Sequence, residues 1–217
     1  MFETVANVLD WIGVIAFAAT GAMVASRKKM DAIGFIILGT VTGVGGGSLR
    51  DLLLGLPVFW VHEPTYLVAC VGVSVALFFT AHIPQARYRY LLWLDAIGLA
   101  IFAVVGAEKA MIAGAGASVA IAMGVITATF GGAIRDLLGG ESPMILFREI
   151  YASAAIAAAA LFTYLAAKGV PHDFAAAAGF AAGLGVRFVA LRYDLSLPRY
   201  RARPDDQTGP DSHFWRT

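Results

Sequence analysis

The sequence predicts an all-α membrane protein with seven transmembrane helices, arranged as an inverted repeat of two three-helix units plus one extra helix. Three observations predict this fold: an apolar composition, seven apolar runs of bilayer length, and a series of matched residues separated by 85 positions. The chain has 217 residues, of which 59% are hydrophobic and only 14% are charged, whereas about a quarter of the residues in a soluble domain are charged. We therefore expect lipid to cover most of its surface.

A helix that spans a bilayer needs about 20 mostly apolar residues. Polar or turn-forming clusters such as Arg27-Lys28-Lys29 separate the apolar runs. Backbone groups in lipid must satisfy their own hydrogen bonds, and the runs lack the alternating polarity of barrel strands, so the runs indicate helices. The predicted spans are 4–26, 32–55, 65–82, 90–108, 116–138, 148–167 and 173–192.

The distribution of lysine and arginine in the short loops predicts the orientation. The first loop contains Arg27, Lys28 and Lys29, the third contains Arg87 and Arg89, and the C-terminal tail contains several arginines. With seven spans these cations all fall on one side, whereas an even number would separate the first loop from the tail. We therefore expect the N-terminus outside and the C-terminus in the cytoplasm.

The internal repeat is visible without any gap. The matched segments, each displaced by 85 positions, are Leu9–Gly13 with Leu94–Gly98, Gly46–Leu53 with Gly131–Leu138, and Tyr66 with Tyr151. The predicted units are a first repeat over 1–86, a second over 87–169, a seventh helix over 170–192, and a polar cytoplasmic tail over 193–217. Because each unit has three spans, the second enters the membrane from the opposite face.

Inverted repeats of this kind are typical of transport proteins, which place the permeation site where the halves meet, at broken helices. We therefore expect this chain to move something small and polar across a bilayer. The seventh helix has no partner in the repeat, so we expect it at the periphery or in an oligomer contact.

A glycine cluster lies inside the second and the fifth predicted span. The clusters are Gly45, Gly46 and Gly47, and Gly131 and Gly132. Glycine destabilises a helix interior by about 1 kcal/mol relative to alanine, so these runs predict a pair of kinks or breaks beside a water-lined path. The alternative is that small residues allow two helices to pack closely.

An arginine and an aspartate follow each cluster. Asp10 and Arg50 are predicted to lie equally deep in the membrane, about 7–9 Å from the ends of their helices at 1.5 Å per residue. Asp95 and Arg135 have the same relation at the opposite face of the membrane. A charge at the centre of a bilayer is unfavourable, so we predict two ion pairs, Asp10–Arg50 and Asp95–Arg135.

Further polar side chains near the glycines are candidates for an ion pathway. Asp51 and Asp136 are expected either to line vestibules that attract cations or to cap helix ends. Hydroxyl groups of Thr42, Ser48 and Thr127 either replace part of an ion's hydration shell or bond back to their own helix.

The sequence gives no indication of an enzyme or a cofactor. The four histidines lack metal-ligand spacing, the single cysteine, Cys70, excludes an internal disulfide, and a net charge of +1 suggests no nucleic-acid partner. Motifs for nucleotide binding and nucleophilic catalysis are missing from the sequence.

The duplicated unit, the two glycine clusters, the two Arg-Asp pairs and the unpaired seventh helix resemble the bacterial branch of the trimeric intracellular cation (TRIC) channel family, whose duplicated domain is also described as glycine-transporter-like. The resemblance covers about residues 4–192. It implies a homotrimer in a bacterial inner (plasma) membrane, with a pore in each subunit flanked by kinked second and fifth helices and selective for monovalent cations. Phe130 stands where the first cluster has Gly45, and it is expected to narrow the path.

We therefore expect a potassium channel, with sodium as a second candidate ion and membrane lipid as the surrounding partner. The alternative is a secondary carrier for a small zwitterion such as glycine, since inverted repeats and broken helices are also typical of carriers. A non-transporting scaffold is the third hypothesis, but it leaves the buried charges without a role.

Overall fold

The structure, a computed structural model, describes residues 2–80, 87–147, 150–193 and 195, and its regular elements are helices. Six of them are long and apolar enough to cross a membrane, and α4 is a shorter apolar helix. The helices are α1 (Phe2–Arg27), α2 (Ala32–Leu53), α3 (Phe59–His62), α4 (Thr65–Thr80), α5 (Arg87–Ile112), α6 (Ala117–Leu138), α7 (Met144–Phe147), α8 (Ile150–Ala167) and α9 (His172–Tyr193).

The seven predicted spans correspond to α1, α2, α4, α5, α6, α8 and α9. The predicted end of the third span at 81–82, the predicted start of the sixth at 148–149 and nearly all of the predicted tail lie outside the described residues. Two short helices, α3 and α7, were not predicted, because four residues are too few to produce a helical hydrophobic pattern. They are displaced by the same 85 positions as the rest of the repeat.

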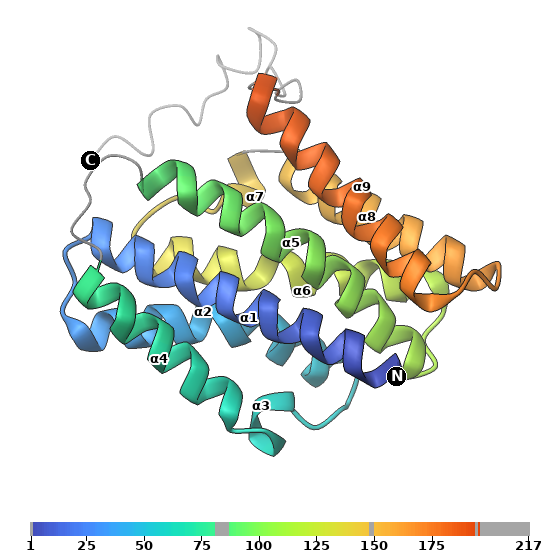
Figure 1. The fold of residues 1–217 in the computed structure, drawn as a ribbon, viewed down its shortest axis with the longest axis horizontal. Coiled ribbons are helices and arrows are strands. Elements are labelled where there is room, and N and C mark those ends of the chain that lie inside the picture. The colour runs from blue at the N-terminus through green and yellow to red at the C-terminus, as the bar shows by residue number, and fades with distance from the viewer. Residues whose placement is uncertain (1, 81–86, 148–149, 194, 196–217) are drawn as a thin grey trace, which may run out of the picture.

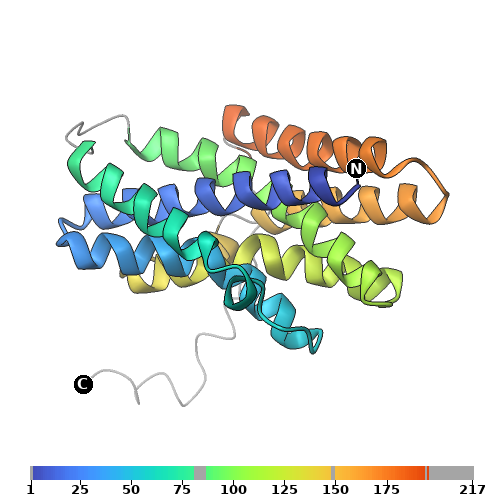
Figure 2. The same cartoon turned by 60° about the horizontal axis from the view of Figure 1, so that its bottom comes forward.

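The centre of the bundle is formed by α1 and α5, which are its most buried spans. They lie side by side and run in opposite directions (Figure 1). Helices α2 and α6 pack against each other and against this pair, while α4 packs on α1 and α2. Helix α9 packs on α8 and α5, so it lies at one side of the molecule and α3 and α4 lie at the other (Figure 2).

Contacts between α1 and α5 are reciprocal. Gly13 packs under the ring of Phe102, and the matched Gly98 packs under the ring of Phe17. The two rings themselves meet edge to face, with their centroids 5.1 Å apart. Gly98 is matched with Gly13 in the repeat, and Phe17 is matched with Phe102, so the second contact repeats the first with the two helices exchanged. The contact between α1 and α5 therefore has the form of a two-fold, self-complementary interface.

The crossing of α2 and α6 is reciprocal in the same way. A methyl group at Gly46 would overlap the carbonyl oxygen of Thr127, and one at the matched Gly131 would overlap the carbonyl oxygen of Thr42. Glycine at these two positions therefore allows the backbones to touch, which is how small residues act between membrane helices.

Both glycine clusters lie inside uninterrupted helix. The expectation of a break in the second and fifth spans is therefore wrong, because the helical hydrogen-bond pattern continues through the glycines and the facing helix occupies the space beside them. A bend at these positions stays a prediction.

Candidate ion pathway

The first polar cluster is centred on Arg50, near the end of α2. Its side chain is 1% exposed, and its Nη2 lies 2.7 Å from Oδ1 of Asp51. The ring of Phe59 lies 6.0 Å from the guanidinium carbon. The Nη1 atom is buried without a hydrogen-bond partner among the described residues. This cluster therefore leaves one strong donor unused in the interior of the protein.

Asp10 does not pair with Arg50, so that predicted ion pair is wrong. The carboxylate of Asp10 instead accepts a hydrogen bond from Lys109 Nζ at 2.5 Å. Lys109 lies in the last turn of α5, next to the first half of α1, and its side chain is 29% exposed. The reason is geometric: α5 runs antiparallel to α1 and brings a lysine to Asp10, which the repeat alone did not reveal.

The second polar cluster is centred on Arg135, at the matched position on α6. Its Nη1 atom lies 2.7 Å from Asp95 Oδ1 and 2.9 Å from the hydroxyl of Thr20, and its Nε donates to Asp136 at 2.9 Å. The side chains of Arg135 and Asp95 are both 0% exposed. The structure therefore brings together Asp95 and Arg135, which the sequence had paired by depth.

Asp51 and Asp136 do not line vestibules, because both are buried and their oxygens are occupied. One oxygen of each binds the preceding arginine. The other oxygen of Asp51 accepts the backbone N–H of Phe59, and that of Asp136 accepts the backbone N–H of Met144, both at 3.0 Å. Each aspartate thus fastens the start of the following short helix, α3 or α7, to the end of its own span.

The predicted hydroxyl ligands all donate hydrogen bonds back to their own helices. Thr42 donates to Leu38, Ser48 to Val44 and Thr127 to Met123. The two threonines are fully buried, while Ser48 is partly exposed and also accepts a hydrogen bond from the indole of Trp60 at 2.8 Å. A hydroxyl oxygen has two lone pairs, so Ser48 keeps one acceptor site.

The remaining candidate residues lie around the α2 and α6 crossing. Gly47 packs against the ring of Phe59, and Gly132 faces the hydroxyl of Tyr151. A methyl group at Gly45 would lie at ordinary contact distance from the side chain of Ile134. Phe130, the residue matched with Gly45, is 37% exposed. The expectation that Phe130 narrows a path stays a prediction.

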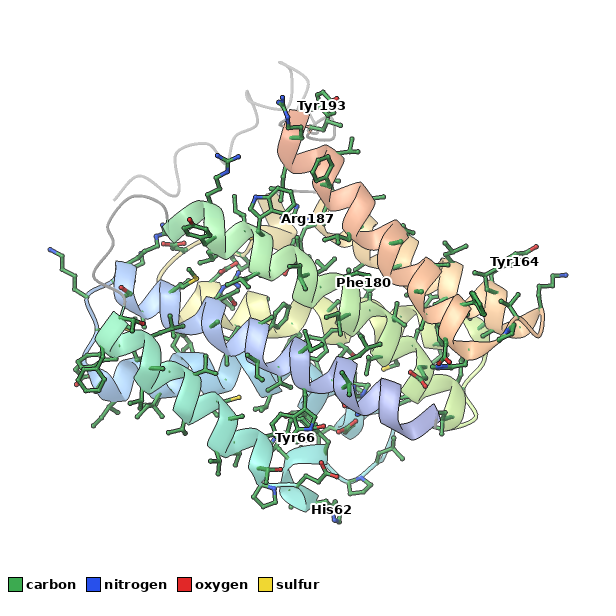
Figure 3. The ribbon with its side chains drawn as sticks, viewed as in Figure 1. His62, Tyr66, Tyr164, Phe180, Arg187 and Tyr193 are labelled. Atoms are coloured by element: carbon green, nitrogen blue, oxygen red, sulfur yellow. The ribbon has the colours of Figure 1, made fainter. Side chains whose placement is uncertain are left out.

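Several polar residues near the clusters were missed by sequence reasoning. Thr20 binds Arg135 from α1. Tyr151 and Arg187 are buried near the second cluster, with the guanidinium carbon of Arg187 5.0 Å from the centre of the Tyr151 ring. Figure 3 shows Arg187 where α9 meets α5, on the other side of α1 from Tyr66. The signal for Arg187 was available, because a lone arginine inside an apolar span is a functional candidate.

The interior contains two clusters centred on arginines, one near the end of α2 and one near the end of α6. The close crossing of α2 and α6 at Gly46 and Gly131 lies between them. Within the described part of the chain, no group of three or more side chains is suited to hold a metal ion. Buried charges of both signs inside membrane helices are typical of proteins that move polar solutes. The fold and this interior define a duplicated, multi-pass membrane protein.

Comparison with known proteins defines the family. The sequence pattern of the family described as "Glycine transporter" matches twice, over residues 7–82 and 92–167. The chain belongs to this family, and within it to the bacterial branch of the TRIC cation channels.

Named relatives support the same assignment. The chain is 42% identical over 199 residues to the UPF0126 inner membrane protein YadS of Escherichia coli K12, covering 88% of this chain and 94% of the relative. It is 40% identical over 194 residues to a UPF0126 membrane protein of Deinococcus radiodurans, covering 88% and 89%. The chain is therefore a multi-pass bacterial membrane protein.

Solved structures share the fold. The TRIC trimeric intracellular cation channel orthologue from Rhodobacter sphaeroides is 62% identical, with a TM-score of 0.86 over 88% of this chain and 100% of that chain. A TRIC cation channel solved to explain conductance is 35% identical, with a TM-score of 0.82 over 91% and 98%. A prokaryotic TRIC channel crystallised in 0.5 M KCl is 30% identical, with a TM-score of 0.83.

Proposed function

We propose that this chain is a passive channel for monovalent cations, chiefly potassium with sodium as a second ion, and that each protomer contains its own pathway. The observation that carries the proposal is the 62% identity and 0.86 TM-score to a protein described as a cation channel. The buried charges at both ends of the α2 and α6 crossing agree with it, because such charges in lipid need a polar path.

The pathway is proposed to run beside the crossing of α2 and α6, between the clusters of Arg50 and Arg135. Ser48 is the hydroxyl best placed to contact an ion, because it is partly exposed and keeps one lone pair. The fully buried Thr42 and Thr127 pack against Gly21 and Gly106 and are assigned a packing role. The buried aspartates shape the helix ends and do not collect cations.

Potassium flux into proteoliposomes tests the function and the role of Ser48 separately. The wild-type protein is expected to give flux above that of empty liposomes. Ser48→Ala is expected to lower it about two- to tenfold, the effect of losing one polar contact worth about 0.5–1.5 kcal/mol. Thr80→Ala is the matched control, because Thr80 makes the same back-bond on an exposed helix end. Absence of wild-type flux would reject the channel, and an unchanged Ser48→Ala would reject only the site.

We also propose that the two halves are inverted across an inner membrane, with the N-terminus outside. Side-chain contacts support this arrangement. Arg27 and Lys28 both bind Glu141, whereas Lys109 binds Asp10 and Glu108 binds His172. With seven crossings, the loops that contain Arg27, Lys28 and Glu141 lie on the cytoplasmic side. The helix ends that contain Asp10, Lys109 and Glu108, together with His172, then lie on the outer side.

A homotrimer is the proposed assembly, since the relative from Rhodobacter sphaeroides is described as trimeric. Native mass spectrometry of the detergent-solubilised protein is expected to give three times the 22.8 kDa chain mass. A mass of one or two chains under conditions that preserve bound lipid would reject the trimer.

A carrier for a small zwitterion such as glycine is the second candidate, because the matching family is described as "Glycine transporter". Single-channel recording separates the two functions. Discrete conductance steps with potassium as the only permeant cation support the channel. Slow, saturable uptake of glycine without such steps supports the carrier.

A further inference from the structure

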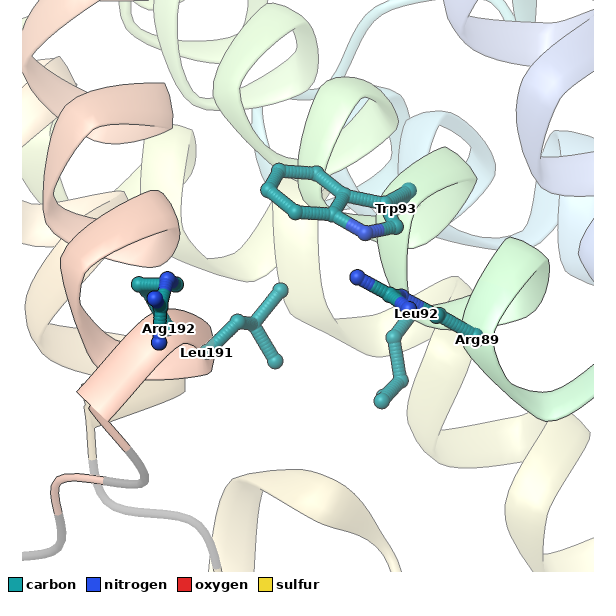
Figure 4. Close-up of a pocket in the computed structure, with 5 residues that line it drawn as sticks. All are labelled: Arg89, Leu92, Trp93, Leu191 and Arg192. Atoms are coloured by element: carbon teal, nitrogen blue, oxygen red, sulfur yellow. The ribbon is translucent and has the colours of Figure 1, made fainter.

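A groove between α5 and α9 has the features of a binding site that the ion pathway does not use. Its volume is about 390 Å³, and it is lined by Arg89, Leu92 and Trp93 from the start of α5 and by Leu191 and Arg192 from the end of α9. In Figure 4 the residues from the two helices face each other across the opening. The groove therefore combines two cations with three apolar side chains.

Neither arginine of the groove is neutralised by a described side chain. The ion pairs among the described residues leave out both Arg89 and Arg192, and none of the described residues that line the groove is a carboxylate. The guanidinium carbon of Arg192 lies 5.8 Å from the centre of the Tyr193 ring, a contact that leaves its charge in place. Two positive charges that no described carboxylate pairs with therefore line the same opening.

A third guanidinium lies one helical turn further inside the bundle. Arg187 precedes Leu191 by four residues and so shares its face of α9. It is 2% exposed, and its Nε and Nη2 atoms have no hydrogen-bond partner among the described residues. Asp95 does not neutralise it, because that carboxylate is bound to Arg135. A buried guanidinium with two unsatisfied nitrogens among the described residues therefore adds positive charge one helical turn from the groove lining.

The position of the groove identifies the chemistry of its ligand. It is formed by the first turns of α5 and the last turns of α9, both candidate membrane spans, so it lies where the hydrocarbon meets the head groups. Tryptophan is typical of this level, and Trp93 is held there by contact with Phe188, with ring centroids 5.6 Å apart. One arginine guanidinium can bind two oxygens of a phosphate at once. Basic pockets between membrane helices bind anionic head groups.

We propose that the α5 and α9 groove binds the phosphate of an anionic phospholipid. Arg89 and Arg192 hold the phosphate, while Leu92, Trp93 and Leu191 contact the glycerol and the first carbons of the acyl chains. A free phosphate would gain nothing from the three apolar side chains, so the lipid-bound phosphate fits the groove better. The site is separate from the α2 and α6 crossing, and its existence does not depend on the transported solute.

Native mass spectrometry of the full chain in detergent, titrated with phosphatidylglycerol or with phosphatidylcholine of the same acyl chains, tests the site. The wild-type protein is expected to retain phosphatidylglycerol at a concentration at least about tenfold lower than phosphatidylcholine. The Arg89→Gln/Arg192→Gln variant is expected to lose about 10- to 30-fold in affinity for phosphatidylglycerol, with little change for phosphatidylcholine.

Lys168→Gln is the matched control, because Lys168 also ends a span and also lies 5.8 Å over a tyrosine ring, that of Tyr164, but borders no part of the groove. Its affinity for phosphatidylglycerol is expected to stay within about twofold of the wild type. Unchanged thermal unfolding of the double variant shows that it folds, and Arg192→Gln alone replaces it if it does not.

Four results would overturn the proposal. Equal retention of the two lipids by the wild-type protein would remove the phosphate preference. Unchanged phosphatidylglycerol binding by the double variant would move the site elsewhere. Displacement of the lipid by glycerol 3-phosphate at the same concentration as phosphatidylglycerol would assign the groove to a soluble anion. Loss of oligomers in the double variant with lipid binding intact would assign it to a second copy of the chain.

Discussion

Asp10 and Asp95 are matched residues, yet their carboxylates bind different cations. Lys109 binds Asp10, whereas the residue matched with Lys109 in the first half is Val24, so no lysine competes for Asp95. Arg135 also binds Thr20, whose matched residue is Val105. Two differences between the halves therefore explain why Arg135 binds both Asp95 and Thr20, whereas Arg50 keeps a buried donor with no partner among the described residues.

This difference predicts unequal effects of the same substitution. Asp95→Asn leaves the fully buried Arg135 without its main counter-charge and is expected to lower the free energy of unfolding by about 3–5 kcal/mol. Asp10→Asn is expected to lower it by about 1 kcal/mol, because Lys109 is partly exposed and can turn to water. Unfolding in detergent followed by circular dichroism measures both. Equal losses would contradict the assignment of partners.

At the scale of the element, glycines of one cluster have different roles in the same helix. A methyl group at Gly46 meets the backbone of α6, whereas one at Gly45 meets the end of the Ile134 side chain at 3.5 Å, an ordinary contact. The α2 helix is continuous through both. Gly46 therefore sets the distance between α2 and α6, and Gly45 does not.

Alanine substitutions separate the two roles. Gly46→Ala is expected to destabilise the protein by about 1–3 kcal/mol, because the facing backbone must move. Gly45→Ala is expected to be neutral or to stabilise by up to about 1 kcal/mol, the helix preference of alanine over glycine. The midpoint of unfolding in denaturing detergent measures both variants. A destabilising Gly45→Ala with a neutral Gly46→Ala would exclude the packing account.

The short helices α3 and α7 show how an element depends on one distant side chain. Each begins eight residues after the aspartate that accepts its first N–H. Gly55 and Gly140, with φ of 66° at both, turn the chain between the span and the short helix, a conformation that favours glycine. Buried arginine, aspartate and short helix thus form one structural unit in each half.

At the scale of the whole molecule, the polar contacts outside the core gather at two ends. Arg27 and Lys28 bind Glu141 at one end, and Asp10, Lys109, Glu108 and His172 pair at the other. Helices far apart in the sequence are thereby held in register. The basic first loop lies at the same end as the start of α5 and the end of α9, since helix directions alternate along the chain.

Cysteine labelling in intact cells tests the proposed orientation. In a Cys70→Ser background, Lys168→Cys is expected to react with a membrane-impermeant maleimide added outside, whereas Lys29→Cys is expected to react only after the membrane is opened, because positively charged loops stay in the cytoplasm. Cys70, the single native cysteine, is buried, and its replacement by serine leaves the introduced cysteine as the one reactive thiol. The reverse pattern would invert the topology, and labelling of both from outside would reject seven crossings.

The sequence by itself determined the helical membrane class, the approximate spans and the residues matched in the two halves. These follow from composition, run length and a constant offset, which are properties of the chain that need no knowledge of packing. The depth argument also brought Asp95 and Arg135 together, because no other cation competes for that carboxylate.

Only the tertiary structure decided the partners that depend on neighbouring helices. Asp10 binds Lys109 and not Arg50, and the aspartates Asp51 and Asp136 accept hydrogen bonds from the first residues of α3 and α7. Gly46 and Gly131 pack against a facing backbone, where a helix break had been expected. The groove between α5 and α9 also joins helices that are not neighbours in the sequence. An ion pair or a close crossing depends on distances between elements, and those distances are fixed by how the helices pack.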